Sequence, residues 1–79
     1  MDTVRFSYKL KILDELIKDS AAAYDIARAA GFKNNQELAN ACGLSHQNTL
    51  ANWRKLSPLK YRVAVIGAAA AETLDKATE

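Results

Sequence analysis

The stretch Asn35 to Lys55, NQELANACGLSHQNTLANWRK, decides how this chain folds. Its pattern predicts a short helix over Gln36 to Cys42, a turn over Gly43 to Ser45, and a second helix over about His46 to Lys55. We therefore expect two helices joined by a tight corner.

Three small or apolar residues support this corner. Ala39 is small enough for two helices to cross closely, and Gly43 tolerates the positive φ that ends a helix sharply. Leu44 follows as an apolar residue that can pack beneath the turn. The pattern indicates a helix-turn-helix.

The second predicted helix has two unlike sides. Leu50 and Trp53 share one side, so Trp53 is expected in the core rather than as a stacking platform. The other side carries Asn48, Ala51, Asn52 and Lys55. Amides, one small residue and a lysine are poor core material, but they suit base edges and phosphates.

Length and composition predict one all-α domain over residues 1–79. A chain of 79 residues buries only roughly 60% of its unfolded surface on folding, so a second domain or an enclosed catalytic cavity is not expected. Three glycines and one proline in an alanine-rich chain are typical of helices.

The net charge of +2 is small, but the basic residues are concentrated in the middle of the chain. Between positions 28 and 62 the only acid is Glu37, and the basic residues are Arg28, Lys33, Arg54, Lys55, Lys60 and Arg62. This asymmetry favours a small surface that faces an anion, although a solvated basic face without a partner has the same pattern.

Cys42 is the only cysteine, so an intrachain disulfide is impossible, and its place on an apolar helix face predicts a small core residue. No stretch approaches the ~20 apolar residues of a membrane span, and the first residues lack the apolar segment of a signal peptide. We expect a cytoplasmic protein without membrane contact.

The first residues allow two readings. Phe6, Leu10, Leu13 and Ile17 lie at helical spacing and predict a helix from about Ser7 to Lys18. Apolar residues also alternate with polar ones at the start of this stretch, so a strand over Thr3 to Tyr8, paired across a dimer, is the alternative.

Two further helices complete the predicted bundle of four to five helices. One runs from about Ser20 to Ala30, with Asp19 or Ser20 as its N-cap and Gly31 ending it, and Asn34 or Asn35 is expected to cap the next. The last runs from about Pro58 to Ala77. Along one side it carries Val63, Ile66, Ala70 and Leu74, adjoined by Tyr61, Val65 and Ala69. Its alanine run suits close packing or a subunit contact.

The sequence also echoes itself at a spacing of twelve, because Gly31 and Phe32 correspond to Gly43 and Leu44. Two successive helical corners would give this echo without a repeat architecture. It creates an alternative in which the helix over Gln36 to Cys42 is the recognition helix of the motif and the helix over Ser20 to Ala30 supports it. We favour the later helix as the recognition helix, because its polar face carries more polar side chains and two basic residues, Arg54 and Lys55, lie close to that face.

The sequence lacks the sets of residues that catalysis and metal binding require. The chain has one histidine and one cysteine, no carboxylate pair at helical spacing to His46, and three isolated glycines that form no phosphate loop. We expect no enzyme, no cofactor, no metal and no small-molecule substrate.

The segments KNNQELANACGLS and TLANWRK together resemble the helix-turn-helix of phage repressors of the CI/Cro type. The resemblance covers roughly Ile26 to Arg62. It implies a compact helical bundle that binds operator DNA, usually as a homodimer on two half-sites, and controls transcription. The predicted protein is thus a phage or prophage repressor in the cytosol of a bacterial host, associated with the nucleoid.

Carried over residue by residue, the resemblance places Gln36 at the start of the supporting helix near a phosphate, and His46, Gln47 and Asn48 at the start of the reading helix. Leu50 follows Gly43 by seven residues, one more than in the family pattern, which leaves open which of these three begins the helix.

The predicted contacts fall into two groups. The residues expected to touch base edges are His46, Gln47, Asn48, Ala51 and Asn52, with N-capping an equal alternative for Asn48. The residues expected to touch phosphates are Lys33, Gln36, Ser45, Arg54, Lys55, Lys60 and Arg62. The alternative function is a helical protein-interaction module, adaptor-like or antitoxin-like, that uses the alanine-rich last helix.

Overall fold

The computed structural model describes residues 3–78, which form five helices and no strand. These are α1 (Thr3–Lys18), α2 (Ala23–Ala29), α3 (Asn35–Ala41), α4 (Gln47–Leu56) and α5 (Pro58–Thr78). The predicted all-α bundle is confirmed. The alternative of a strand over Thr3 to Tyr8 is wrong, because α1 already includes these residues and begins at Thr3.

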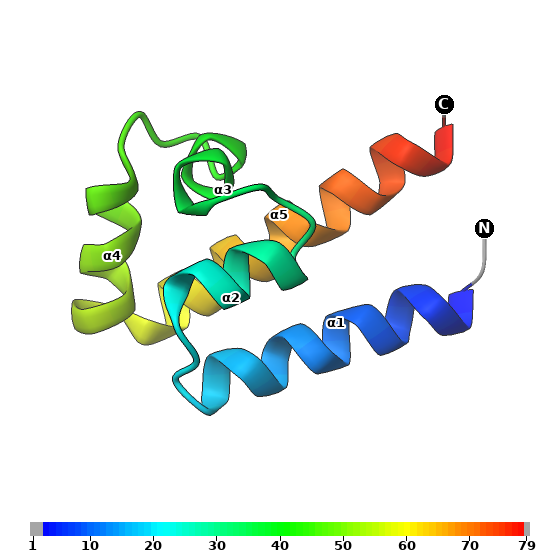
Figure 1. Cartoon of the computed structure of the whole chain (residues 1–79), viewed down its shortest axis with the longest axis horizontal. Helices are drawn as coiled ribbons and strands as arrows, with labels where there is room; N and C mark the ends of the chain where they lie inside the picture. The colour runs from blue at the N-terminus through cyan, green and yellow to red at the C-terminus, as the bar shows by residue number, and fades with distance from the viewer. Residues whose placement is uncertain (1–2, 79) are drawn as a thin grey trace.

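The long helix α5 is the support of the bundle, since α1, α3 and α4 all pack against it. Figure 1 shows α5 passing behind α2, with α1 along one side of both and α4 standing across one end of the molecule. None of the helices in residues 3–78 combines the length and hydrophobicity needed to cross a membrane.

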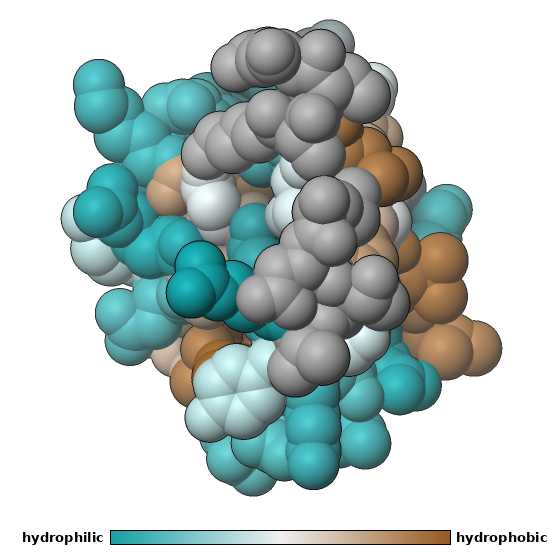
Figure 2. All heavy atoms as spheres, turned by 90° about the vertical axis from the view of Figure 1, so that its right-hand side faces the viewer, coloured by the Kyte–Doolittle hydropathy of each residue, from teal (hydrophilic) through white to brown (hydrophobic). Residues whose placement is uncertain are grey.

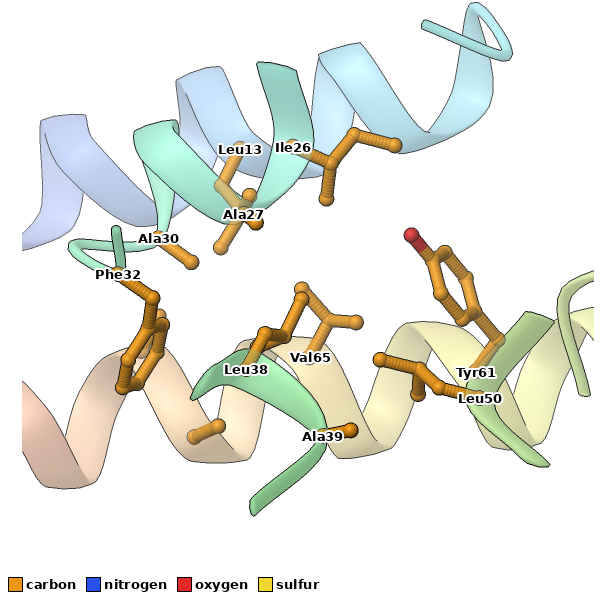
Figure 3. Packing of buried hydrophobic residues seen from close by; sticks show 12 residues of the cluster. Leu13, Ile26, Ala27, Ala30, Phe32, Leu38, Ala39, Leu50, Tyr61 and Val65 are labelled. Carbon is orange, nitrogen blue, oxygen red and sulfur yellow. The ribbon is translucent and has the colours of Figure 1, made fainter. Parts of the chain in front are cut away.

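A single apolar core lies between the helices (Figure 3). Its largest fully buried side chains are Leu13, Ile26, Leu38, Leu50 and Val65. Ala39 is fully buried where α3 approaches its neighbours, as its small size predicted. Cys42 is half-buried against this core, and burial raises the pKa of its thiol.

The core takes the adjoining residues of α5 rather than the whole apolar side that the sequence outlined. Val63 and Leu74 of that side are 64% and 48% exposed, whereas Tyr61, Val65 and Ala69 are buried. The helix is apolar on more than one side, so hydrophobic spacing does not fix its rotation. Contacts with α1, α3 and α4 fix the rotation instead.

The echo at a spacing of twelve reflects two copies of the same helix ending. Gly31 and Gly43 both have positive φ, at 102° and 83°. The next residue in each case donates its N–H to a carbonyl five residues back, Phe32 to Ala27 and Leu44 to Ala39, each at 2.9 Å. This is the Schellman ending, in which an apolar residue follows the left-handed one.

A third ending of this kind overturns the predicted cap of α2. Ser20 has a φ of 58°, and Ala21 donates its N–H to the carbonyl of Leu16 at 3.0 Å. Ser20 therefore ends α1 rather than starting α2, which begins at Ala23 after Ala22 with no side-chain cap. Asn34, in contrast, caps α3 as expected, because its Oδ1 accepts the N–H of Glu37 at 2.9 Å.

We expect Ser20→Gly to raise the free energy of unfolding by about 0.5–1 kcal/mol, because glycine adopts positive φ without the steric cost that serine carries. Urea unfolding followed by circular dichroism measures it. Ser7→Gly, at an exposed position inside α1, is the matched control and should lower stability by about 1 kcal/mol. Equal losses from both changes would contradict the prediction.

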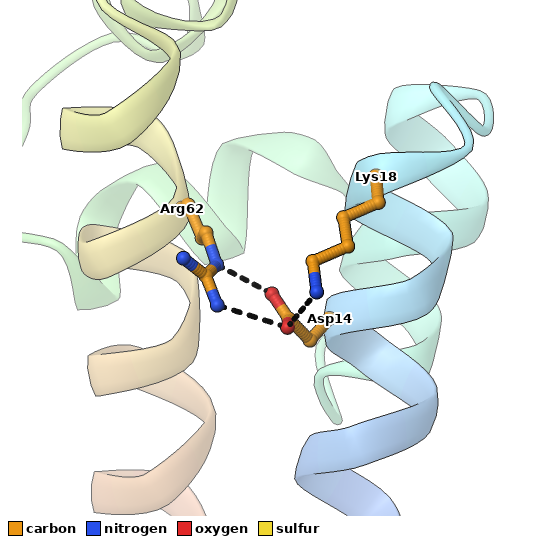
Figure 4. Close-up of polar contacts among 3 residues, drawn as sticks. All are labelled: Asp14, Lys18 and Arg62. Atoms are coloured by element: carbon orange, nitrogen blue, oxygen red, sulfur yellow. Dashed lines mark hydrogen bonds and ion pairs between the residues drawn. The ribbon is translucent and has the colours of Figure 1, made fainter.

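An ion-pair cluster ties α1 to α5 (Figure 4). Arg62 donates two hydrogen bonds to Asp14, at 2.6 and 3.0 Å, and Lys18 lies 3.3 Å from the same carboxylate. The hydrogen bonds from Arg62 lower the pKa of Asp14 below its ordinary value of 3.8, against a smaller opposing effect of burial.

The free energy of unfolding should therefore depend on pH through Asp14. A carboxyl whose pKa is lowered in the folded state stabilises the fold above its unfolded pKa, and this stabilisation is lost as the pH falls through the folded value. We expect Asp14→Asn to be less stable than the wild type at neutral pH and the difference to vanish at acid pH. Urea titrations between about pH 5 and pH 2 measure it, with the exposed Asp19→Asn as the charge control. A difference that persists in full at the lowest pH would show that the carboxylate charge is not the cause.

Candidate nucleic-acid interface

Helix α4 is buried on one side only. Leu50 is 1% exposed in the core, and Trp53 is half-buried against it, as predicted from their shared side. Helix α4 packs against α3 and α5. Its remaining surface faces outward at one end of the molecule (Figure 1).

All of the residues predicted to touch base edges are exposed on or beside α4, namely His46, Gln47, Asn48, Ala51 and Asn52. Gln47, Asn48, Ala51 and Asn52 share one outward side at helical spacing, and Lys55 continues it by one turn. The structure therefore brings two glutamine or asparagine amides in the first turn into line with a third amide and a lysine.

The structure shows which of His46, Gln47 and Asn48 begins α4. His46 is the N-cap residue, with extended backbone and no hydrogen bond from its side chain to the helix, and Gln47 is the first helical residue. Asn48 lies inside the helix, so it is not the N-cap. Its exposed amide thus remains available for an external contact.

Gln36 links α3 to the beginning of α4. Its Oε1 accepts the N–H of Gln47 at 3.1 Å, which satisfies one of the donors that a helix start leaves open. Its Nε2 donates to the carbonyl of Ser45 and to Oδ1 of Asn40, both at 3.0 Å. Gln36, predicted beside a phosphate, thus holds the turn and the first peptide of α4 in one geometry.

The residues predicted to touch phosphates divide into two groups. Lys33, Ser45, Lys55 and Lys60 have exposed side chains, with the Lys60 ammonium 4.4 Å from the ring centroid of Trp53. Arg54 and Arg62 turn toward the protein. Arg54 donates to the carbonyl of Ala21 and its guanidinium lies 6.0 Å from the Tyr61 ring centroid, while Arg62 bonds Asp14.

Sequence reasoning missed one residue of this region and the intramolecular contact of another. Thr49 is exposed in the first turn of α4, and its hydroxyl is a further donor and acceptor beside Asn48. The sequence feature that could have indicated Thr49 is its position in the first turn of the predicted second helix, beside Asn48. Arg54 joins the end of α4 to the turn after α1, and no sequence spacing indicated that contact.

The electrostatics of α4 favour an anion beside it. No acidic residue lies in its first turn, Lys55 lies in its last, and the N-terminus of a helix carries partial positive charge. By contrast α3, the alternative reading helix, has seven residues and carries the exposed acid Glu37 in its first turn. The geometry thus favours α4.

No protein-family model matches this chain, and no match was found among curated proteins or solved structures.

Proposed function

We propose that this protein is a sequence-specific DNA-binding transcriptional regulator that places α4 in the major groove. The observation that supports it best is the exposed side of α4, where three amides, Ala51 and Lys55 lie in line with no acid among them. The resemblance of residues around α3 and α4 to CI/Cro-type repressors favours a phage or prophage repressor acting in the bacterial cytosol.

The dimensions and chemistry of α4 suit this role. A helix of ten residues is about 15 Å long, and the major groove of B-DNA is wide enough to admit an α-helix. Asparagine and glutamine amides can bond adenine through N6 and N7, so Gln47, Asn48 and Asn52 are the proposed base readers. Ala51 would contact a thymine methyl group.

Phosphate contacts would come from the exposed basic and polar residues on either side of α4. Lys33 and Lys55 are the main candidates, with Ser45 and Lys60 adjacent. Such contacts fix the orientation of the protein and make affinity fall with salt, without reading sequence. Arg54 and Arg62 are weaker candidates, because binding phosphate would require them to leave Ala21 and Asp14.

Selection of bound duplexes from a random DNA library tests the proposal, followed by fluorescence titration of the selected duplex at two salt concentrations. We expect an enriched sequence, preferred over a scrambled duplex by on the order of a thousandfold or more if two copies bind together. Binding of both duplexes with equal affinity would overturn specific readout, and absence of salt-dependent binding would overturn the proposal as a whole.

A second function is favoured by one specific observation. Leu59 and Val63, one turn apart on α5, are 68% and 64% exposed, and neighbouring exposed apolar side chains mark interaction sites. An adaptor-like or antitoxin-like module without DNA specificity would use this surface. Such a module would show no enriched duplex in the selection experiment.

A further inference from the structure

A pocket of about 470 Å³ lies where the end of α1, the end of α4 and the start of α5 meet. We call it the α1–α5 pocket, and its wall includes Ile17 and Lys18 of α1, Arg54 of α4, and Leu59, Tyr61 and Arg62 of α5. Its volume falls in the range of roughly 300–1,000 Å³ that is usual for small-molecule sites. Helix α1 ends and α5 begins at the same end of the molecule (Figure 1), and Figure 2 shows the opposite end. None of the amides proposed to read bases lines this pocket.

Tyr61 supplies a buried polar atom that the fold does not use. The residue is 3% exposed, and its hydroxyl is buried without a hydrogen-bond partner among residues 3–78. Most buried polar atoms are hydrogen-bonded, because an unpaired one has lost its contact with water and gained nothing in exchange. In Figure 3 the Tyr61 ring extends from α5 toward α1 and α2, and α1 forms the facing wall of the pocket.

The protonation state of this phenol suits a hydrogen-bond donor. Burial raises the pKa of Tyr61 above its ordinary value of 10, against a smaller opposing effect of the Arg54 charge. The hydroxyl therefore keeps its proton at neutral pH. An acceptor placed in the pocket would satisfy it.

The charged side chains of the pocket wall are basic. Lys18, Arg54 and Arg62 line it, and no acid of residues 3–78 does so. Asp14 pairs with Lys18 and Arg62 from beside the pocket and offsets part of this charge. Arg54 has no such acid: within residues 3–78 its guanidinium donates only to the carbonyl of Ala21, so most of its five N–H donors are available.

The rest of the wall is mainly apolar. Ile17 is half-buried, and Pro58 and Leu59 are exposed beside the basic residues. Leu59 is 68% exposed, so a ligand with an apolar body would remove a large apolar side chain from water. An inorganic ion would leave these side chains uncovered. The wall thus matches a molecule with a charged group and an apolar body.

We infer that the α1–α5 pocket binds a small organic carboxylate with an apolar body. The carboxylate accepts hydrogen bonds from the Tyr61 hydroxyl and from the Arg54 guanidinium, whose planar donors match carboxylate geometry. The guanidinium carbon of Arg54 lies 6.0 Å from the Tyr61 ring centroid, so one carboxylate can reach both side chains. The apolar body packs against Ile17 and Leu59. This inference does not rest on DNA binding, because it concerns the protein alone.

Titration of the full chain with benzoate and with octanoate, followed by amide NMR, tests the inference. We expect at least one of the two to bind with a Kd of roughly 1 mM or below, with the largest shifts at residues of the pocket. Acetate lacks the apolar body and benzyl alcohol lacks the charge, so both should bind at least about tenfold more weakly than the better acid. No binding of either acid at about 10 mM, or shifts scattered over the surface, would overturn the inference.

Tyr61→Phe tests the role of the unpaired hydroxyl. It should weaken binding of the better acid on the order of tenfold, because one hydrogen bond to the carboxylate is lost. Its thermal midpoint without ligand should equal or exceed that of the wild type, since the change removes a buried polar atom that has no partner. Tyr24→Phe is the matched control, because Tyr24 is 57% exposed on α2 and should alter neither quantity. Unchanged affinity of Tyr61→Phe, or a marked fall in its midpoint, would contradict a hydroxyl that waits for a ligand.

Arg54→Lys tests the second contact. Lysine keeps the positive charge but lacks the planar pair of donors, so we expect it to weaken binding of the same acid several-fold. Lys55→Arg, on the outward side of α4, is the control and should bind the acid as the wild type does. Equal affinity of Arg54→Lys and the wild type would show that the guanidinium does not hold the carboxylate.

Discussion

Leu38→Ala should lower the free energy of unfolding by about 2–5 kcal/mol, because it removes buried apolar groups and leaves a cavity that the surrounding helices cannot fill. Leu38 is fully buried, and in Figure 3 it points from α3 toward Val65 of α5. It thus lies where α3 meets α5. A domain of this size has a total stability of only about 4–12 kcal/mol, so the loss is a large share.

Thermal unfolding followed by circular dichroism measures this loss, and we expect the midpoint to fall by roughly 10–30 °C. Leu56→Ala is the matched control, because Leu56 is 82% exposed and the same atoms are removed. Measured on diluted protein, it should change stability by no more than about 0.5 kcal/mol. Equal effects of the two changes would show that Leu38 does not occupy the core.

Asn52→Ala should weaken binding to the selected duplex by roughly 5- to 150-fold, the equivalent of about 1–3 kcal/mol, and leave binding to random DNA nearly unchanged. Asn52 lies in the middle of the exposed side of α4, and a bidentate bond from its amide to adenine would be lost. Its exposed position and the high helix propensity of alanine mean that the fold should remain intact.

Lys55→Ala is the comparison that separates base-specific contacts from electrostatic contacts with phosphates. Lys55 is exposed in the last turn of α4, so its loss should weaken binding to both duplexes alike and reduce the salt slope by roughly 1. Fluorescence titrations of both variants at several salt concentrations give the two quantities. If Asn52→Ala and Lys55→Ala behaved identically on both duplexes, direct readout by α4 would be refuted.

The short-range features of the fold were predictable because they depend on neighbouring residues. Gly31 and Gly43 predicted the ends of α2 and α3, and their positive φ confirms it. Asn34 predicted the start of α3, and Pro58 begins α5. In each case one residue satisfies or stops the backbone hydrogen bonds of the adjoining turn, so a few residues of sequence are enough.

The outward side of α4 was predictable for a related reason. Leu50 and Trp53 differ so strongly in polarity from Gln47, Asn48 and Asn52 that only one rotation of the helix buries the apolar pair. The contrast along the helix therefore indicated the candidate interface before any tertiary contact was known. DNA binding by this side stays a prediction.

The long-range features were not predictable in this way. Arg54 and Arg62 looked like phosphate contacts, but their partners Ala21 and Asp14 lie 33 and 48 residues away in the chain. Nothing local distinguishes an arginine that bonds a distant carbonyl or carboxylate from one that faces solvent. Ser20 likewise resembled a helix cap, yet its left-handed φ ends α1.

The rotation of α5 shows the same division most clearly. Its residues are apolar on several sides, so Val63 and Val65 are equally acceptable inside, and the packing of α1, α3 and α4 around it buries Val65 and leaves Val63 exposed. Residues close together in the chain determine where a helix ends and, for a strongly amphipathic helix such as α4, which side is buried. The inner side of α5 and the partner of each arginine follow from which helices meet in space, because the energy that selects them comes from contacts between distant segments.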